Sequence, residues 1–519
     1  MTGGGFIGLI AYGAQNVLLS GNPDMTYWYK IFRRYSHYAQ ENVSVALEGQ
    51  NELFYTQPIR LRIKLQRVGD LLSDMYFSFR VPDIYSKYVN PANRGSQWEY
   101  EWVRFLGAAI VQNAAIFVGG QKIQEVDGTY LLARALLDYD ANQFEKWRLL
   151  VGDAPELNDP ARGIYAGGTE QIGYPSVFSN PVAPNGVQVN RPSIFGQDIH
   201  VPLGFWFSET SSQALPLIAL QYHDCEVQLT LNSISDIYTI LDSSGFRVNP
   251  LYAMMAQDTQ LALNQPEYVP TNDQSTEWRN FATDIGTNPP PLNGWFLNPR
   301  LQCTYVYLTD EERKVFATEP LSYLFSQITW YSFPGLYNRQ ILDLYTHNPI
   351  TRLIFIQRRS DSVPYRNDIA NFTNWWNFPY PSFIPTPGQT PLNTKANSSG
   401  LFFPQGQPGI MRSLRVLADG NEIQEEKPID YFTKITPWKT MSGKSMPINQ
   451  IPVYNFMLHS PSSQPSGSIN ASRIKNFQVE VDFYPLPPEP NYVYDLTIYV
   501  ESLNFFEVAG GMGGLKYAL

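Results

Sequence analysis

The chain has 519 residues, with 37 Lys and Arg against 47 Asp and Glu, and therefore carries a net charge of -10. An acidic chain is poorly suited to nucleic acid, because affinity for the phosphate backbone comes from Lys and Arg side chains that neutralise phosphates. Charged residues make up only 16% of the chain and aromatic residues 14%, against a charged share of about 25% in ordinary soluble domains. We therefore expect no direct nucleic-acid partner and a surface that is partly used in protein contacts.

At the N-terminus, Gly3 to Ile10 is glycine-rich and mildly apolar, and no Lys or Arg occurs before Lys30. The basic region of a secretory signal is therefore missing. No stretch of 18 apolar residues occurs anywhere, so we expect no segment that spans a bilayer. Asn22 and Pro23 predict a helix start. The basic group Lys30, Arg33 and Arg34 then suits the end of that helix, or a contact with anionic lipid or an acidic protein.

Short runs of β-branched and aromatic residues, broken by Gly, Pro, Asn or Asp, dominate the chain and predict an all-β protein built of sandwiches. In Arg60 to Leu65 charged and apolar residues alternate, which predicts a half-buried strand. Similar strands are predicted at Met75–Val81, Ala115–Val118, Cys225–Leu231, Arg352–Gln357, Phe477–Phe483 and Tyr492–Val500. Helical patterns are few. Thr309 to Glu312 forms a capping box that predicts a short helix ending near Pro320.

A short internal repeat, called the echo below, suggests a duplication. The hexapeptide Gly120-Gln-Lys-Ile-Gln-Glu recurs as Gly420-Asn-Glu-Ile-Gln-Glu, and each copy directly follows an apolar strand. Two unrelated hairpins that look alike by chance are the alternative. A duplication makes Ile123 and Ile423 equivalent. It also predicts one domain at 23–240, a connecting region at 241–297, a second domain at 298–508 and a tail at 509–519.

The segment from Asp361 to Pro408 is rich in Pro, Asn, Ser and aromatic residues, and we predict an exposed surface loop. Its aromatic residues, which include Trp375, Trp376, Phe378 and Tyr380, would also suit a carbohydrate-binding platform. Asn371 and Asn397 begin N-glycosylation sequons, which mean little without a secretory route.

No active site is recognisable. The five histidines show no metal-site spacing, and the one dense cluster is His223-Asp224-Cys225. Cys225 opens an alternating strand, which favours a core role over that of a nucleophile. The glycine runs at 3–5 and 510–514 lack the strand, helix and Lys of a phosphate loop, and they predict flexible ends. The carboxylate pairs Glu311-Glu312 and Glu425-Glu426 suit a helix start and a solvated hairpin. We therefore predict no catalytic, cofactor-binding or metal-binding residue, and no enzyme.

A series of motifs runs along nearly the whole chain: Ala11–Gln15, Gly21–Pro23, Tyr29–Tyr35, Gly69–Asp74, Ala214–Leu220, Leu308–Arg313, His347–Pro349, Pro465–Arg473 and Gly513–Ala518. Together these motifs resemble those of the major capsid proteins of nucleocytoplasmic large DNA viruses. No single motif is specific, but their order and span together are.

The resemblance implies two consecutive eight-stranded jelly-roll β-sandwiches with short helices and long loops, and residues 1–22 as an inward-facing segment. It implies a homotrimeric, pseudo-hexagonal capsomer of an icosahedral virion, assembled in the host cytoplasm. The implied partners are neighbouring capsomers, minor capsid proteins and an internal membrane. A sugar-binding β-sandwich surface protein and a jelly-roll enzyme are the alternatives.

Overall fold

The fold is known from a computed structural model of the chain. It describes residues 13, 21–23, 34–84, 99–158, 194–241, 247–255, 267–271, 276–282, 294–374, 409–443, 450–460, 464–486 and 492–517. The chain divides into two units, Met1–Ala39 and Gln40–Leu519. Most of the first unit, including Lys30 and Arg33 and most of the predicted first helix, lies outside the described residues. All that follows concerns the second unit.

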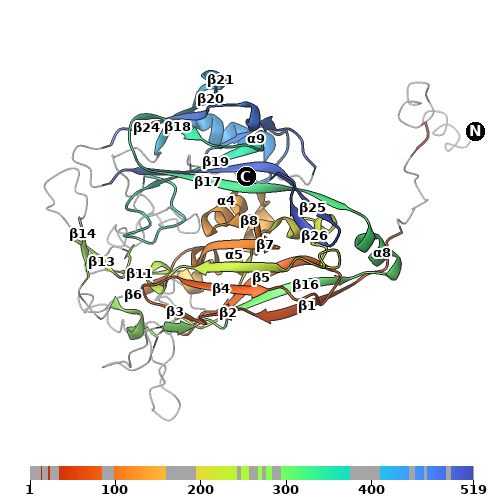
Figure 1. Ribbon diagram of the computed structural model, residues 1–519. Helices are drawn as coiled ribbons and strands as arrows, with labels where there is room; N and C mark the ends of the chain where they lie inside the picture. Colours follow the sequence, from red (N-terminus) through yellow and green to blue (C-terminus); the bar gives the residue numbers. More distant parts are fainter. Residues whose placement is uncertain are drawn as a thin grey trace, which may run out of the picture. The chain divides into compact units, whose positions relative to one another are not determined.

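The first jelly roll consists of two facing antiparallel sheets (Figure 1). One sheet has the order β1 (Ala39–Ala46), β16 (Arg300–Tyr307), β5 (Leu71–Arg80) and β9 (Asp198–Pro202). The other has the order β2 (Glu48–Gly49), β4 (Ile59–Lys64), β10 (Cys225–Leu231), β7 (Val111–Val118) and β8 (Gln121–Val126). Small sheets flank them, formed by β3 (Glu52–Phe54) with β15 (Gly294–Phe296), β6 (Glu99–Trp102) with β11 (Tyr238–Leu241) and β12 (Arg247–Val248), and β13 (Tyr252–Met255) with β14 (Glu267–Pro270).

The second jelly roll repeats this plan. One sheet has the order β17 (Leu321–Leu336), β25 (Tyr494–Ala509), β19 (Pro349–Arg359) and β22 (Val453–Asn455), with β23 (Ile469–Asn470) and β26 (Met512–Leu515) added. The other has the order β18 (Arg339–Leu344), β24 (Phe477–Phe483), β20 (Met411–Ala418) and β21 (Asn421–Pro428). When the eight main strands of each roll are numbered in chain order, both rolls show the sheets 1-8-3-6 and 2-7-4-5. The predicted pair of jelly rolls is confirmed.

The echoed hexapeptides form matching hairpins. Gly119–Gly120 and Asp419–Gly420 are two-residue turns in which both residues have positive φ, as type I′ hairpin turns require. The strand register then shifts at Ile123 in the first hairpin and at Ile423 in the second. The two isoleucines therefore occupy the same bulge of the same strand, as the duplication predicts.

Short helices fill the connections between strands. They are α3 (Leu106–Ile110), α4 (Gly128–Asp138), α5 (Ala141–Leu150), α6 (Pro155–Asn158), α8 (Asp310–Thr318), α9 (Thr436–Thr440), the π-helical turn η9 (Tyr431–Ile435) and the 3-10 turns η3 (Trp206–Ser208), η4 (Ser211–Gln213), η5 (Ile234–Asp236), η7 (Trp278–Asn280) and η10 (Ala471–Arg473). The predicted helix after Thr309 is present as α8, although the Thr309 side chain makes no capping hydrogen bond. None of the helices that the structure describes is long and apolar enough to cross a bilayer.

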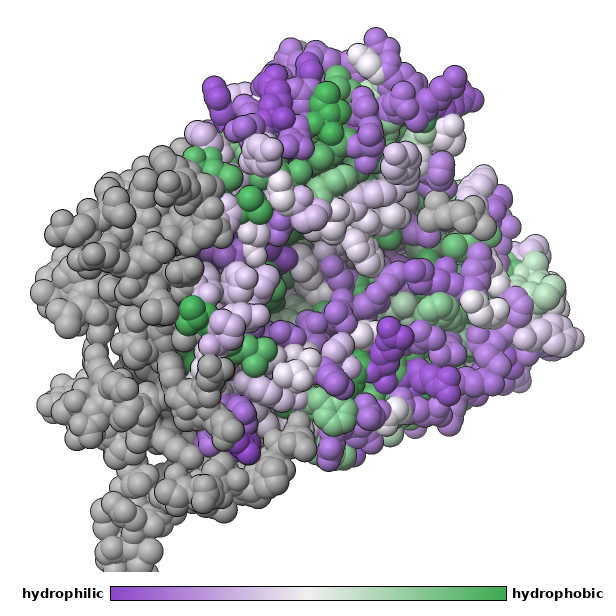
Figure 2. All heavy atoms as spheres, turned by 60° about the vertical axis from the view of Figure 1, so that its left-hand side comes forward, coloured by the Kyte–Doolittle hydropathy of each residue, from purple (hydrophilic) through white to green (hydrophobic). Residues whose placement is uncertain are grey.

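Burial follows the strand alternation. In β4 the side chains of Ile59, Leu61 and Ile63 are buried and those between them are exposed, which confirms the predicted half-buried strand. Figure 2 shows one side of the molecule, on which hydrophilic residues predominate and hydrophobic residues form small separate patches.

The structure corrects the predicted domain boundaries. The strand β16, which was assigned to the second roll, pairs with β5 from Arg300 to Val306 and is the eighth strand of the first roll. The region 241–297 is likewise not a simple connection, since β15 pairs with β3 beside that roll. The division between the rolls therefore lies after Tyr307.

Two predicted surface segments are also corrected. Residues 361–374 are largely buried: Asn367 donates hydrogen bonds to the carbonyls of Ser235 and Tyr238, both at 2.7 Å. The rest of the predicted loop, with its four aromatic residues and Asn397, lies outside the described residues. The predicted flexible glycine run near the C-terminus instead forms β26, which pairs with β25.

Candidate functional surfaces and the junction between the rolls

The cluster His223-Asp224-Cys225 does not assemble a nucleophile. Burial raises the pKa of the Cys225 thiol to about 12, and the Nδ1 atom of His223 lies 2.9 Å from the carbonyl oxygen of Gly513. The carboxylate of Asp224 pairs with Lys64 at the surface. Within the described ranges, no three His, Cys, Asp or Glu side chains lie close enough together to hold a metal ion.

The carboxylate pairs singled out in the sequence have ordinary surface roles. Glu425 pairs with Lys427, and Glu426 pairs with Arg339 across the outer face of the second roll. Glu311 and Glu312 lie in the first turn of α8, as the helix dipole favours.

The most unusual site is a buried ion cluster where the two rolls meet. Arg352 of β19 donates to both carboxylate oxygens of Asp138, at the end of α4, over 2.6 Å each. The same guanidinium donates to Glu501 of β25 at 2.6 and 2.7 Å and to the hydroxyl of Ser460 at 2.8 Å. Tyr130 of α4 donates to Glu501 as well, at 2.7 Å. The side chains of Arg352, Asp138 and Glu501 are at most 5% exposed.

This cluster is satisfied rather than reactive. Burial alone would lower the pKa of Arg352, but the two carboxylates raise it well above its ordinary value. Removal of one member of such a group leaves a buried charge without its partner, which is far more costly than loss of a surface pair. The cluster therefore fixes α4 of the first roll against the sheet of the second.

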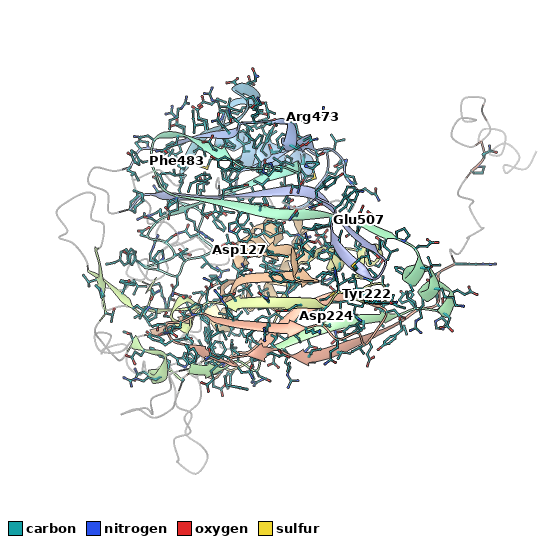
Figure 3. All side chains as sticks on the ribbon, in the orientation of Figure 1. Asp127, Tyr222, Asp224, Arg473, Phe483 and Glu507 are labelled. Carbon is teal, nitrogen blue, oxygen red and sulfur yellow. The ribbon has the colours of Figure 1, made fainter. Side chains whose placement is uncertain are left out.

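A second buried contact lies beside it. Asp127 caps α4 by accepting from the backbone N–H of Tyr130, and it also accepts from the hydroxyl of Tyr499 in β25 at 2.6 Å. Burial raises the pKa of Asp127, and burial likewise raises that of Tyr499. Figure 3 shows Asp127 between the sheets of the two rolls.

Two further contacts complete the junction. Gln124 of β8 donates to the carbonyl of Ser326 in β17 at 3.3 Å and accepts from the backbone N–H of Trp206. The indole of Trp206 packs against Phe325 and Phe506 of the second roll, with ring centroids 5.3 and 5.5 Å apart.

The C-terminal hairpin of β25 and β26 reaches back onto the first roll. The backbone N–H of Tyr222 donates to Gly511, and that of Leu515 donates to the side chain of Gln121 at 3.1 Å. Tyr222 and Glu507, labelled in Figure 3, mark the two sides of this contact.

A groove of about 920 Å³ also borders both rolls. Tyr76, Arg134 and Trp147 line it from the first roll, and Lys439 and His459 line it from the second. Its lining mixes both charge signs with aromatic side chains, a composition that selects no ligand class.

Sequence reasoning missed the ion cluster, because Asp138, Arg352 and Glu501 lie far apart in the chain. A signal was present: Arg352 is the one charge in the apolar run Ile350–Ile356, and Glu501 the one charge in Ile498–Leu503. A single charge inside a buried strand requires a partner.

Comparison with known proteins agrees with this architecture. Residues 26–269 match the family model described as the major capsid protein N-terminus, and residues 312–514 match that of the large eukaryotic DNA virus major capsid protein. The chain belongs to this major capsid protein family. The two matched segments correspond to the two jelly rolls, and the gap between them contains β16 and the division after Tyr307.

Several relatives match this capsid protein over nearly its full length. It is 24% identical to the major capsid protein of Phaeocystis pouchetii virus and 22% identical to that of Paramecium bursaria Chlorella virus 1, with 99% of each chain covered. Among solved structures, the PBCV-1 virus capsid gives a TM-score of 0.62 at 18% identity, with 95% of this chain and 100% of that chain covered. The Faustovirus major capsid protein gives a TM-score of 0.61 at 12% identity, with 96% and 94% covered. The family forms the capsid of large DNA viruses, and the sugar-binding alternative is not favoured.

Proposed function

We propose that three copies of the chain form a pseudo-hexagonal capsomer, and that these capsomers tile the outer icosahedral shell of a large DNA virus. The observation that carries this proposal is the identical strand order of the two rolls, held in one fixed relationship by the buried Arg352 cluster. Two similar rolls repeated about a threefold axis supply six similar lobes. Such a block packs hexagonally although its true symmetry is only threefold.

Light scattering on the purified chain tests this proposal. A mass of three chains, stable on dilution to micromolar concentration, is expected. A single-chain mass at that concentration would contradict it.

We propose a structural and not a catalytic role. Support comes from the ionisable groups that the sequence singled out: Cys225 is buried, His223 contacts the C-terminal hairpin, and the paired glutamates form surface ion pairs or begin a helix.

The remaining partners are neighbouring capsomers, minor capsid proteins and an internal membrane, with assembly in the host cytoplasm. For the membrane and minor proteins the candidate is the N-terminal segment, whose apolar residues precede the basic group around Lys30. Deletion of residues 1–20 should leave the trimer intact and weaken its attachment to the particle. Wild-type attachment of the shortened chain would exclude this role.

A further inference from the structure

Within one chain, the outer face of the second roll's 1-8-3-6 sheet covers a defined part of the first roll. That part is the fifth strand, β8, and the helix that follows it, α4. Ile354 and Tyr499 of the sheet belong to the same hydrophobic cluster as Ile123 of β8 and Tyr130 of α4. The rings of Tyr130 and Tyr499 lie 5.5 Å apart.

The 1-8-3-6 sheets of the two rolls share one irregularity at the same place. In each sheet the third strand has a one-residue bulge opposite the eighth strand, at Ser73 in β5 and at Thr351 in β19. The Ser73 hydroxyl donates to the carbonyl of Thr304 at 3.2 Å, and the Thr351 hydroxyl donates to that of Glu501 at 3.1 Å. The next residue along the third strand is Asp74 in the first roll and Arg352 in the second. Asp74 is therefore the counterpart of the arginine that joins the rolls.

In the second roll, the strand and helices equivalent to β8 and α4 are exposed to solvent. In the second roll the fifth strand is β21, and it is followed by η9 and α9. Tyr130 on α4 is only 3% exposed, whereas Trp438 on α9 is 83% exposed and Ile435 beside it is 44% exposed. Trp438 and Ile435 are three residues apart and so lie on one helical face, and exposed apolar side chains that are grouped in this way favour a protein contact.

The matching sheet face of the first roll is open as well. On β1 and β16, Asn42 is exposed and Gln302 and Thr304 are partly exposed. Figure 1 shows β1 and β16 on one side of the molecule and β21 and α9 on the other. At one end, however, the two faces approach each other, since Asp74 and Lys439 both border the groove of about 920 Å³ at the junction. Faces that are inclined to each other in this way close a ring, whereas opposed faces give an open filament.

Charge supports the same pairing. Within one chain, Arg352 on the third strand pairs with Asp138 at the end of α4. The residue equivalent to Arg352 in the other roll is Asp74, and the residue equivalent to Asp138 is Lys439, near the end of α9. The signs are exchanged but still complementary. In the part of the chain that the structure describes, neither Asp74 nor Lys439 has an ion-pair partner. Asp74 is instead hydrogen-bonded by the Tyr76 hydroxyl at 3.4 Å.

We propose that, in the capsomer, the β1–β16–β5–β9 face of one subunit covers β21, η9 and α9 of the next subunit, with Trp438 as the apolar anchor and Asp74 facing Lys439 of that neighbour. The contact between subunits thus repeats the contact between the rolls of one chain. This inference rests on the proposed trimer and specifies its interface. The occupant of the exposed face is a second copy of the same chain.

Light scattering of full-length variants tests this contact. W438D should lower the mass from three chains to one, while the circular dichroism spectrum stays that of the wild type. Tyr345→Asp, a matched control at a side chain that is 76% exposed between β18 and β19, should remain trimeric. Asp74→Lys and Lys439→Glu should each raise the concentration at which the trimer dissociates at least tenfold, and the double variant should recover most of the lost trimer stability.

The outcomes separate the two proposals. A trimeric wild type with a trimeric W438D overturns this contact and leaves the capsomer standing, whereas a monomeric wild type overturns both. If W438D fails to fold, the charge-reversal variants decide. Single variants that form the trimer as strongly as the wild type, or a double variant whose trimer is as weak as that of the single variants, would contradict the contact.

Discussion

Arg352 and Asp138, 214 residues apart in the chain, form a two-point ion pair whose N–O distances are both 2.6 Å, at the junction of the two rolls. The pair joins a strand of the second roll to the helix that follows the fifth strand of the first. Because this pair is formed within one chain, the relative placement of the two rolls is fixed in the single chain and does not depend on assembly with other copies.

Replacement of Arg352 by alanine should lower the free energy of unfolding by about 3 to 5 kcal/mol, because it leaves Asp138 and Glu501 buried without their shared cation. Chemical denaturation measures the change. Arg412→Ala is the matched control, since that side chain is 66% exposed and lies 3.7 Å from Asp482, and it should change stability little. Equal effects of the two variants would refute the structural role of the cluster.

The two thiols should be unreactive in the folded protein. Burial raises the pKa of Cys225 and of Cys303 to about 12, so the thiolate stays scarce up to about pH 10, whereas an ordinary thiol ionises near pH 8.5. Alkylation followed by mass spectrometry should show slow labelling of native protein at pH 8 and rapid labelling in denaturant. Rapid native labelling that rises through pH 8.5 would show that a thiol is accessible.

Removal of residues 510–519 should destabilise the junction. The truncation removes the hydrogen bonds from Tyr222 to Gly511, from Gly513 to His223 and from Leu515 to Gln121, which at roughly 1 kcal/mol each amount to about 2 to 4 kcal/mol. Thermal unfolding measures this loss. Lys516→Ala, which removes an exposed ion pair with Glu507 and a contact of the ammonium group with the Phe505 ring but none of these three hydrogen bonds, serves as the control. An unchanged melting temperature of the truncated chain would mean that the hairpin contributes nothing.

The sequon at Asn371 should stay unmodified in folded protein. Its side chain is fully buried, donates to Asp368 at 3.0 Å and accepts from the Thr373 hydroxyl at 2.7 Å. Peptide mapping of protein expressed through a secretory pathway should find no glycan there. Asn371→Ala should cost about 1 to 3 kcal/mol, since it leaves buried polar groups without a partner. A folded, glycosylated Asn371 would contradict the buried placement.

Much of the fold could be predicted from local patterns. Alternation identified β4, and the echo around Gly120 and Gly420 identified two equivalent hairpins, because both depend on neighbouring residues. The membership of β16 could not be predicted, since its partner β5 lies more than 200 residues earlier. The burial of residues 361–374 was missed for another reason. Their polar side chains, such as Asp361 and Arg366, satisfy one another and so have the composition of a surface loop.

The helix α4 was also missed. Leu131, Leu132, Ala133, Ala135 and Leu137 are buried on several sides of the helix, because one roll lies on each side of it. A helix enclosed in this way lacks the polar stripe that makes a surface helix recognisable. The candidate site could not be predicted for the same reason, since it exists only where the rolls meet.

Electron microscopy of the purified oligomer, viewed along its symmetry axis, tests the central claim most directly. Two rolls of one topology in each of three chains predict class averages with six lobes of similar size and a nearly hexagonal outline. Averages with three lobes, with twofold symmetry, or of single chains would contradict the account.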